Sequence, residues 1–142
     1  MNSKERIHTS LNHQQPDRIP IDIGGSGTSG LHVKNVKDLR EYLGLETITV
    51  KGFEPYQMLG WMDEDILDAL DIDVQCLPGE KTMIGFPNQN WKPWVMDNGQ
   101  EVLMSEKFEY DRLEDGSIVV YPEGDRSASP SVKMPKGGFF FD

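Results

Sequence analysis

The segment Arg-Ile-Pro-Ile-Asp-Ile-Gly-Gly-Ser-Gly-Thr-Ser-Gly, residues 18–30, joins an alternating apolar stretch to a glycine-rich loop. Its apolar side chains occupy every second position, as in a strand with one buried face: Ile19, Ile21 and Ile23. Pro20 favours the start or the edge of such a strand. Apolar residues then recur at helical spacing from about Leu31, until Gly44 supplies a left-handed stop. The order strand, glycine loop, helix predicts an α/β layer.

The sequence on either side of this unit predicts further helices and strands. Ser3 is a suitable N-cap for a first helix, which Pro16 ends. Asp63 is a suitable cap for another helix, and this helix passes into a strand over residues 72–76. Residues 47–50 have strand propensity but form only a short run.

The pattern changes after Pro78 and Gly79. Short apolar runs are now separated by dipeptides typical of tight turns: Asn98-Gly99, Asp115-Gly116 and Gly124-Asp125. This alternation predicts β-hairpins. We therefore divide the chain into residues 1–80, with the helices and βα units, and residues 81–142, with the antiparallel hairpins.

Composition and charge exclude several classes of function. The chain has 142 residues, with 14 Lys and Arg against 24 Asp and Glu and a formal net charge of −10. That charge opposes binding to nucleic acid or to an anionic membrane surface. Cys76 is the one cysteine, which excludes an internal disulfide framework. With no long apolar run, we expect a cytoplasmic protein without a nucleic-acid or membrane partner.

The glycine loop is the main candidate for a functional site. Residues 25–30 satisfy G-x-G-x-x-G between a predicted strand and a predicted helix, the context of a dinucleotide-binding loop. The next predicted strand ends at Lys51 instead of an acidic residue, so an NADP-binding Rossmann fragment is one alternative. A plain tight turn is a second alternative, and a loop that lines a ligand pocket is a third. For the third, the candidate substrate-binding residues are Asp22, Gly24, Gly25, Ser26, Thr28, Ser29 and His32.

Three segments resemble the uroporphyrinogen decarboxylase superfamily. Residues 4–22 resemble its N-terminal helix, its Pro-Asp-Arg-hydrophobic-Pro motif and its first barrel strand, and residues 67–74 resemble the helix before the second strand. Residues 91–142 resemble a hairpin insertion of the corrinoid-methyltransferase-like branch. The resemblance implies the N-terminal part of a (β/α)8 TIM barrel with an antiparallel β-hairpin insertion. Because a whole barrel needs about 250 residues, it also implies a chain truncated relative to the family.

One departure from the family favours a particular chemistry. The decarboxylases carry Arg-Gln-Ala-Gly-Arg after the first strand, whereas this chain has no arginine between Arg18 and Arg40. A methyltransferase is therefore favoured over a decarboxylase-type lyase of porphyrin biosynthesis, which stays an alternative. The resemblance implies zinc and methylcobalamin for a full-length relative, with the metal activating a thiol acceptor. Those zinc ligands belong to the family's C-terminal half, so we expect no cofactor in this chain and no activity from it alone.

The same resemblance implies partners. They are the missing C-terminal half or a corrinoid protein, and a homo-oligomer is also possible within this interpretation. A non-catalytic binding or assembly module, in which the acidic hairpin half docks another chain, is an alternative from a different class of function.

Overall fold

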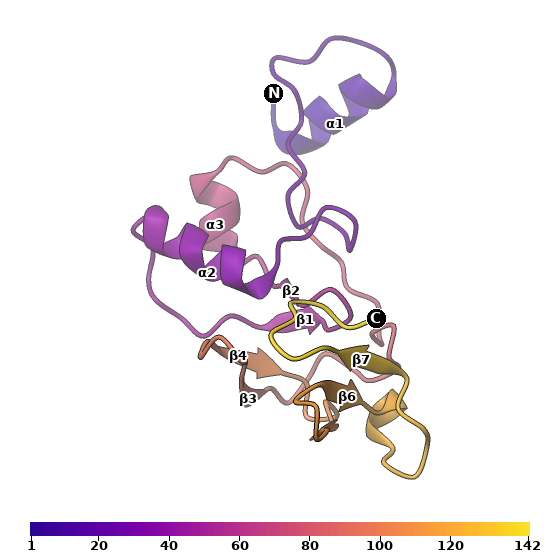
Figure 1. Cartoon of the computed structure of the whole chain (residues 1–142). Helices are drawn as coiled ribbons and strands as arrows, with labels where there is room; N and C mark the ends of the chain where they lie inside the picture. Colours follow the sequence, from indigo (N-terminus) through magenta and orange to yellow (C-terminus); the bar gives the residue numbers. More distant parts are fainter.

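A computed structural model describes residues 1–142 (Figure 1). It has three α-helices: α1 (Ser3–Leu11), α2 (Val33–Tyr42) and α3 (Glu64–Ala69). Seven short strands form three antiparallel sheets: β1 (Gly52–Glu54) with β2 (Leu59–Gly60), β3 (Lys92–Val95) with β4 (Glu101–Met104), and β5 (Tyr110–Arg112), β6 (Ile118–Val120) and β7 (Val132–Met134) in the order β5-β6-β7. A 3₁₀ turn occupies Pro122–Gly124. None of the helices combines the length and the apolar character that crossing a membrane requires.

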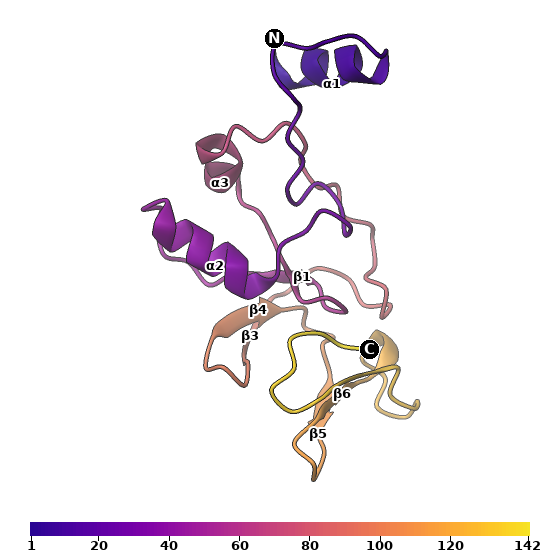
Figure 2. The same ribbon diagram turned by 45° about the horizontal axis from the view of Figure 1, so that its top comes forward.

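Helix α1 begins one residue earlier than the predicted cap implies. Asn2, not Ser3, is the N-cap, and its side chain accepts a hydrogen bond from the Glu5 N–H while Glu5 accepts one from the Asn2 N–H. This reciprocal capping box satisfies two backbone donors. The helix ends at Leu11, well before Pro16. In Figures 1 and 2 α1 stands at one end of the molecule, away from the sheets.

A polar clamp, defined here as Arg6, Asp17, Arg18 and Asp73, attaches α1 to the rest of the chain. Arg6 Nε lies 2.7 Å from Asp17 Oδ1, and Arg6 Nη1 lies 2.5 Å from Asp73 Oδ1. Arg18 Nη1 lies 2.7 Å from the other Asp73 oxygen. The Asp73 side chain is fully buried, and Arg6 is the one buried residue of α1. The helix is therefore anchored by buried charges rather than by an apolar face.

Helices α2 and α3 pack near one another over β1 and β2. The expected apolar stripe of α2 is confirmed, since Val33 and Val36 are fully buried. Arg40 on the same helix donates to both carboxylate oxygens of Asp65 on α3, at 2.8 and 2.6 Å. Gly44 adopts a φ of +67°, the left-handed conformation that the sequence predicts for the end of this helix.

The predicted hairpins are confirmed where the turn dipeptides stand. Asn98 and Gly99 connect β3 to β4, with Val95 opposite Glu101, and Asp115 and Gly116 connect β5 to β6. Gly99 and Gly116 have φ values of +82° and +81°, which glycine adopts without steric cost. A longer connection through the 3₁₀ turn joins β6 to β7.

The hydrophobic core draws on both halves of the chain. Seventeen buried residues form one cluster. Its members include Val33, Val36, Met58 and Ile66 from the first half and Phe86, Trp94, Met104, Phe108, Val120 and Phe141 from the second. A ring contact of 5.1 Å joins Trp94 to Phe108, which also lies 6.1 Å from the Phe141 ring. This cluster holds the helices and the antiparallel sheets together.

The expected TIM-barrel fold is wrong. All three sheets are antiparallel with two or three strands, and residues 19–23 and 72–76, expected as the first barrel strands, are not strands. These segments share one backbone hydrogen bond, from the Asp73 N–H to the Ile21 carbonyl. Side chains take the place of the ladder: Arg18 donates to the Ile19 carbonyl, and Asp73 accepts from the Ile21 N–H. Pro20 has no N–H to contribute, and Ile19 remains 83% exposed.

Candidate functional site

The glycine loop is held by its own side chains. Asp22 Oδ1 accepts hydrogen bonds from the Gly25 N–H at 2.9 Å and from the Ser29 hydroxyl at 2.8 Å. The Ser26 hydroxyl lies 2.9 Å from that of Thr28, and the Gly24 N–H donates to the Ser29 carbonyl. Several N–H groups that a pyrophosphate would need are thus already engaged. The loop is pre-organised as a wall.

Two glycines of this loop are required by their surroundings. Gly24 has a φ of +85°, and a Cβ there would lie 2.5 Å from Met62 Cγ. At Gly25 a Cβ would lie 2.5 Å from both Asp22 Oδ1 and Val74 Cγ1. A side chain at either position would push the loop away from residues 62 and 74. The glycines therefore let the loop pack closely on the segment that leads to Cys76.

The loop lines a cavity of about 280 Å³, here called the loop hollow. Its remaining wall comes from residues that follow the second predicted strand and from β1: Phe53, Glu54, Cys76, Leu77, Pro78, Gly79, Lys81, Thr82, Met83 and Asn88. Two of these carry buried polar atoms without a hydrogen-bond partner, Thr82 Oγ1 and Asn88 Oδ1. An unpartnered buried polar atom costs about 1–3 kcal/mol, so a ligand that pairs with both atoms gains what the free chain lacks. The loop hollow is the candidate binding site.

Cys76 lies in this wall as a neutral thiol. Burial raises the pKa of Cys76, and the nearby Asp22 carboxylate raises it further. A thiolate is the nucleophilic form of cysteine, and here its formation is disfavoured. Cys76 therefore contributes an uncharged, half-buried wall to the loop hollow.

The predicted site residues divide into three groups. Gly25 and Ser26 line the loop hollow. Asp22, Gly24, Thr28 and Ser29 do not line it, but they hold the loop through the bonds described above. His32 lies elsewhere: it caps α2 through Lys34, and its Nε2 lies 3.1 Å from the Phe139 carbonyl.

The sequence interpretation missed Thr82 and Asn88. Both lie in a segment without regular structure between the Pro78-Gly79 turn and β3, where periodicity is uninformative. The one useful indication was the turn itself, since it reverses the chain after Cys76 and returns it toward the glycine loop.

The zinc that the resemblance implies does not fit these residues. No three His, Cys, Asp or Glu side chains lie close enough together to hold a metal ion. Zinc needs at least three protein ligands in a catalytic site. We therefore derive no step of methyl transfer through a metal in this chain.

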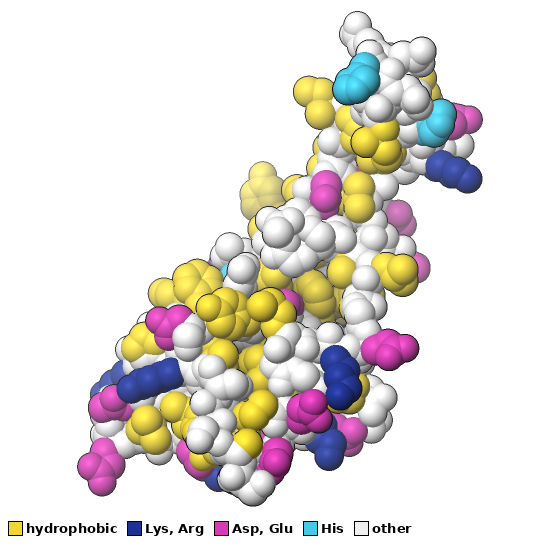
Figure 3. All heavy atoms as spheres, turned by 90° about the vertical axis from the view of Figure 1, so that its right-hand side faces the viewer, with side chains coloured by type: hydrophobic (Ala, Val, Ile, Leu, Met, Phe, Trp, Pro, Cys, Tyr) yellow, Lys and Arg dark blue, Asp and Glu magenta, His cyan; other side chains and the backbone are white.

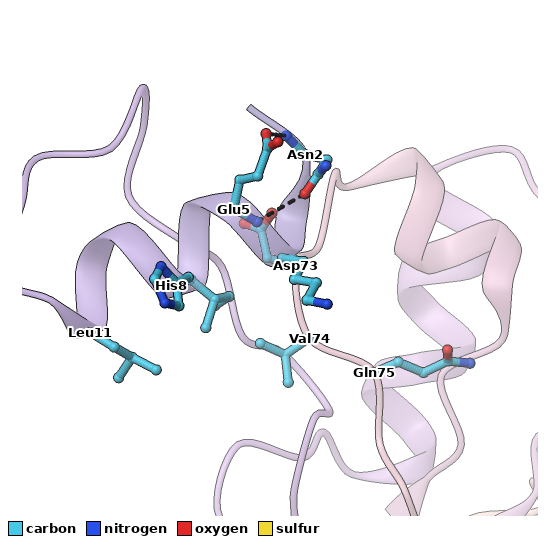
Figure 4. A pocket seen from close by; sticks show the side chains of 9 residues that line it. Asn2, Glu5, His8, Leu11, Asp73, Val74 and Gln75 are labelled. Atoms are coloured by element: carbon cyan, nitrogen blue, oxygen red, sulfur yellow. Dashed lines mark hydrogen bonds between the residues drawn. The ribbon is translucent and has the colours of Figure 1, made fainter.

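The largest cavity, about 680 Å³, lies between α1 and residues 73–75 (Figure 4). Its apolar walls include Leu11 and Val74, and Figure 4 shows Asn2 and Glu5 at one side, joined in the capping box. The Asp73 carboxylate that borders it is fully occupied by the polar clamp. This groove has no buried polar group left to orient a ligand, unlike the loop hollow.

Comparison with protein-family models, with curated proteins and with solved structures found no match for this chain.

Proposed function

We propose that this chain is the ligand-binding segment of a uroporphyrinogen-decarboxylase-like methyltransferase. In this proposal the loop hollow holds the thiol acceptor, and the chain transfers no methyl group by itself. The observation that carries it is the pair of unpartnered buried atoms, Thr82 Oγ1 and Asn88 Oδ1, in the wall of the same cavity as Gly25 and Ser26.

The chemistry of the wall suits a small neutral thiol or alcohol. The Asn88 carbonyl can accept from an S–H or O–H group, and the Thr82 hydroxyl can donate or accept. The glycines allow a ligand to approach the loop backbone closely. Neutral Cys76 adds no negative charge that would oppose a partly ionised acceptor.

The proposed binding is tested by NMR with 2-mercaptoethanol as the probe, in a buffer reduced with a phosphine. We expect saturable shifts of the backbone amide signals of Gly25, Ser26, Thr82 and Asn88. Thr82→Ala should weaken this binding, since it removes the hydroxyl. Thr9→Ala on α1 makes the same chemical change outside the hollow and should leave binding unchanged. Shifts spread evenly over the surface, or equal in Thr82→Ala and the original chain, contradict the proposal.

The proposed lack of activity has its own test. Methylcobalamin, zinc and 2-mercaptoethanol are incubated with the chain, and demethylation of the corrinoid is followed by its absorbance. The rate should equal that without protein. A protein-dependent rate contradicts this part of the proposal while leaving the binding site intact.

A further inference from the structure

A second cavity adjoins the loop hollow and differs from it in chemistry. This aromatic hollow has a volume of about 230 Å³ and is lined by Lys51, Phe53, Trp61, Pro78, Asn88 and Trp91. It shares Phe53, Pro78 and Asn88 with the loop hollow, so the two cavities form neighbouring parts of one cleft. Three of its six lining residues are aromatic.

The aromatic walls are fixed by the backbone and by one another. The Trp61 N–H donates to the Lys51 carbonyl at 2.8 Å, next to the β1–β2 pair. The Phe53 and Trp61 rings meet edge to face, with centroids 5.6 Å apart. Trp91 directly precedes β3. Flat side chains from two separate hairpins thus surround one small space, and offset or edge-to-face contacts with a further ring are favourable.

The polar groups around this space are mainly unused donors. Lys51 Nζ lies 5.8 Å from the centroid of the Trp91 ring and forms neither an ion pair nor a hydrogen bond in the chain. Lys51 also attracts Asp63, but the ion-pair partner of Asp63 is Arg40, at 3.7 Å. The indole N–H groups of Trp61 and Trp91 have no partner in the chain either. In a chain of net charge −10, a half-buried ammonium without a carboxylate partner is a distinct feature.

We infer that the aromatic hollow binds a small aromatic carboxylate, with its ring against Phe53, Trp61 and Trp91 and its carboxylate on Lys51. A cationic ligand would meet the Lys51 charge, and an aliphatic anion would leave the aromatic faces without a flat partner. The volume restricts the ligand to a single ring with short substituents. The inference rests on the proposed function, because it names the class of ligand that the same cleft accepts beside the thiol-binding hollow.

The test compares four probes of similar size at neutral pH: benzoate, benzamide, cyclohexanecarboxylate and benzylamine. Binding is followed by tryptophan fluorescence and by NMR shifts of the residues around Lys51. Benzoate should bind saturably and at least about tenfold more tightly than the other three, since it alone pairs a flat ring with a negative charge. Equal affinity for all four, or no saturable binding of benzoate, overturns the inference.

Variants assign the binding to this cavity. Lys51→Met keeps the length of the stem and should lower benzoate affinity about tenfold, whereas Lys51→Arg keeps the charge and should restore most of it. Lys107→Met removes the same charge from an exposed lysine and should change nothing. Trp91→Phe should reduce the fluorescence response while buried Trp94 still reports a folded core. Unchanged benzoate affinity in Lys51→Met overturns the inference.

The outcomes separate the two proposals. If benzoate binds through Lys51 while 2-mercaptoethanol leaves Gly25 and Thr82 unshifted, the aromatic site stands and the thiol-binding function falls. If 2-mercaptoethanol shifts those signals while benzoate does not bind, the function stands and this inference falls.

Discussion

The α1 end and the core are held by opposite kinds of interaction. The only buried residue of α1 is Arg6, and the helix depends on the polar clamp around fully buried Asp73. The core is a cluster of seventeen buried apolar residues to which α2, α3 and the hairpins all contribute. Figure 3 shows the same elongated shape, with hydrophobic side chains on the surface along its length. Buried ion pairs respond to pH and to loss of one partner, whereas apolar contacts respond to lost volume. The two ends should therefore fail under different conditions.

The largest effect is expected from cutting into the core. Phe108 is 1% exposed and its ring contacts those of Phe86, Trp94 and Phe141. Phe108→Ala should lower the free energy of unfolding by about 3–5 kcal/mol, because it leaves a cavity where strands from different sheets meet. Urea unfolding followed by circular dichroism measures the change. Phe140→Ala, at a ring that is 57% exposed, is the control and should cost much less. Equal costs for the two variants would show that the core does not depend on the Phe108 ring.

Breaking the polar clamp should have a smaller and local effect. Asp73→Asn leaves the guanidinium groups of Arg6 and Arg18 without their shared carboxylate, which should cost about 2–4 kcal/mol. Hydrogen exchange should show lost protection over residues 6–11 of α1 while β6 keeps its own. Asp68→Asn removes a carboxylate that forms no ion pair and should alter neither. Simultaneous loss of protection in α1 and β6 would mean that the two ends unfold as one unit.

Acid should separate the ends in the same way without a mutation. Burial alone would raise the pKa of Asp73, but hydrogen bonds from the Ile21 N–H and from Arg6 and Arg18 hold it well below its usual range. Arg6 and the N-terminal ammonium lower the pKa of Asp17 as well.

Carboxyl groups with lowered pKa values stabilise the fold fully above their unfolded values near about pH 4. That contribution is lost as the pH falls from there toward the folded pKa values. Hydrogen exchange of α1 should therefore accelerate below about pH 4 before that of β6. Equal acceleration in both, after correction for the intrinsic rate, would contradict this order.

Local sequence patterns predicted most of the hairpin half, and they failed where structure depends on distant partners. Asn98-Gly99 and Asp115-Gly116 specify their own backbone conformation, so both turns were predictable. The alternation from Ile19 to Ile23 resembles a strand, but a strand also needs a ladder, and Arg18 and Asp73 side chains occupy those backbone groups.

The site shows the same division. The glycine loop is a local pattern and could be proposed from the sequence, whereas Thr82, Asn88 and Trp91 reach the cleft only through tertiary packing. The Asn2 cap differs from the predicted Ser3 by one position, because both residue types can accept the same bond.

The smallest expected effect concerns a polar contact on the core side, at His32. Its Nδ1 accepts from the Lys34 N–H and its Nε2 lies 3.1 Å from the Phe139 carbonyl, an arrangement that the neutral ring with its proton on Nε2 satisfies. Burial lowers the pKa of His32, with Phe139 opposing and Lys34 reinforcing that shift. The unfolded chain therefore binds the proton more tightly, and stability should fall as the pH drops below about 6.5.

His32→Asn keeps an acceptor for the α2 cap but does not titrate, so it should remove this part of the pH dependence. We expect a difference below about 1 kcal/mol between the two chains' changes in unfolding free energy from pH 7.5 to 5.5, with the original chain losing more. Urea midpoints at the two pH values measure it. His8 and His13 titrate in both chains and cancel in the comparison. An identical loss in the original chain and in His32→Asn would mean that protonation of His32 is not opposed by folding, and that the pH response of this molecule belongs to the polar clamp alone.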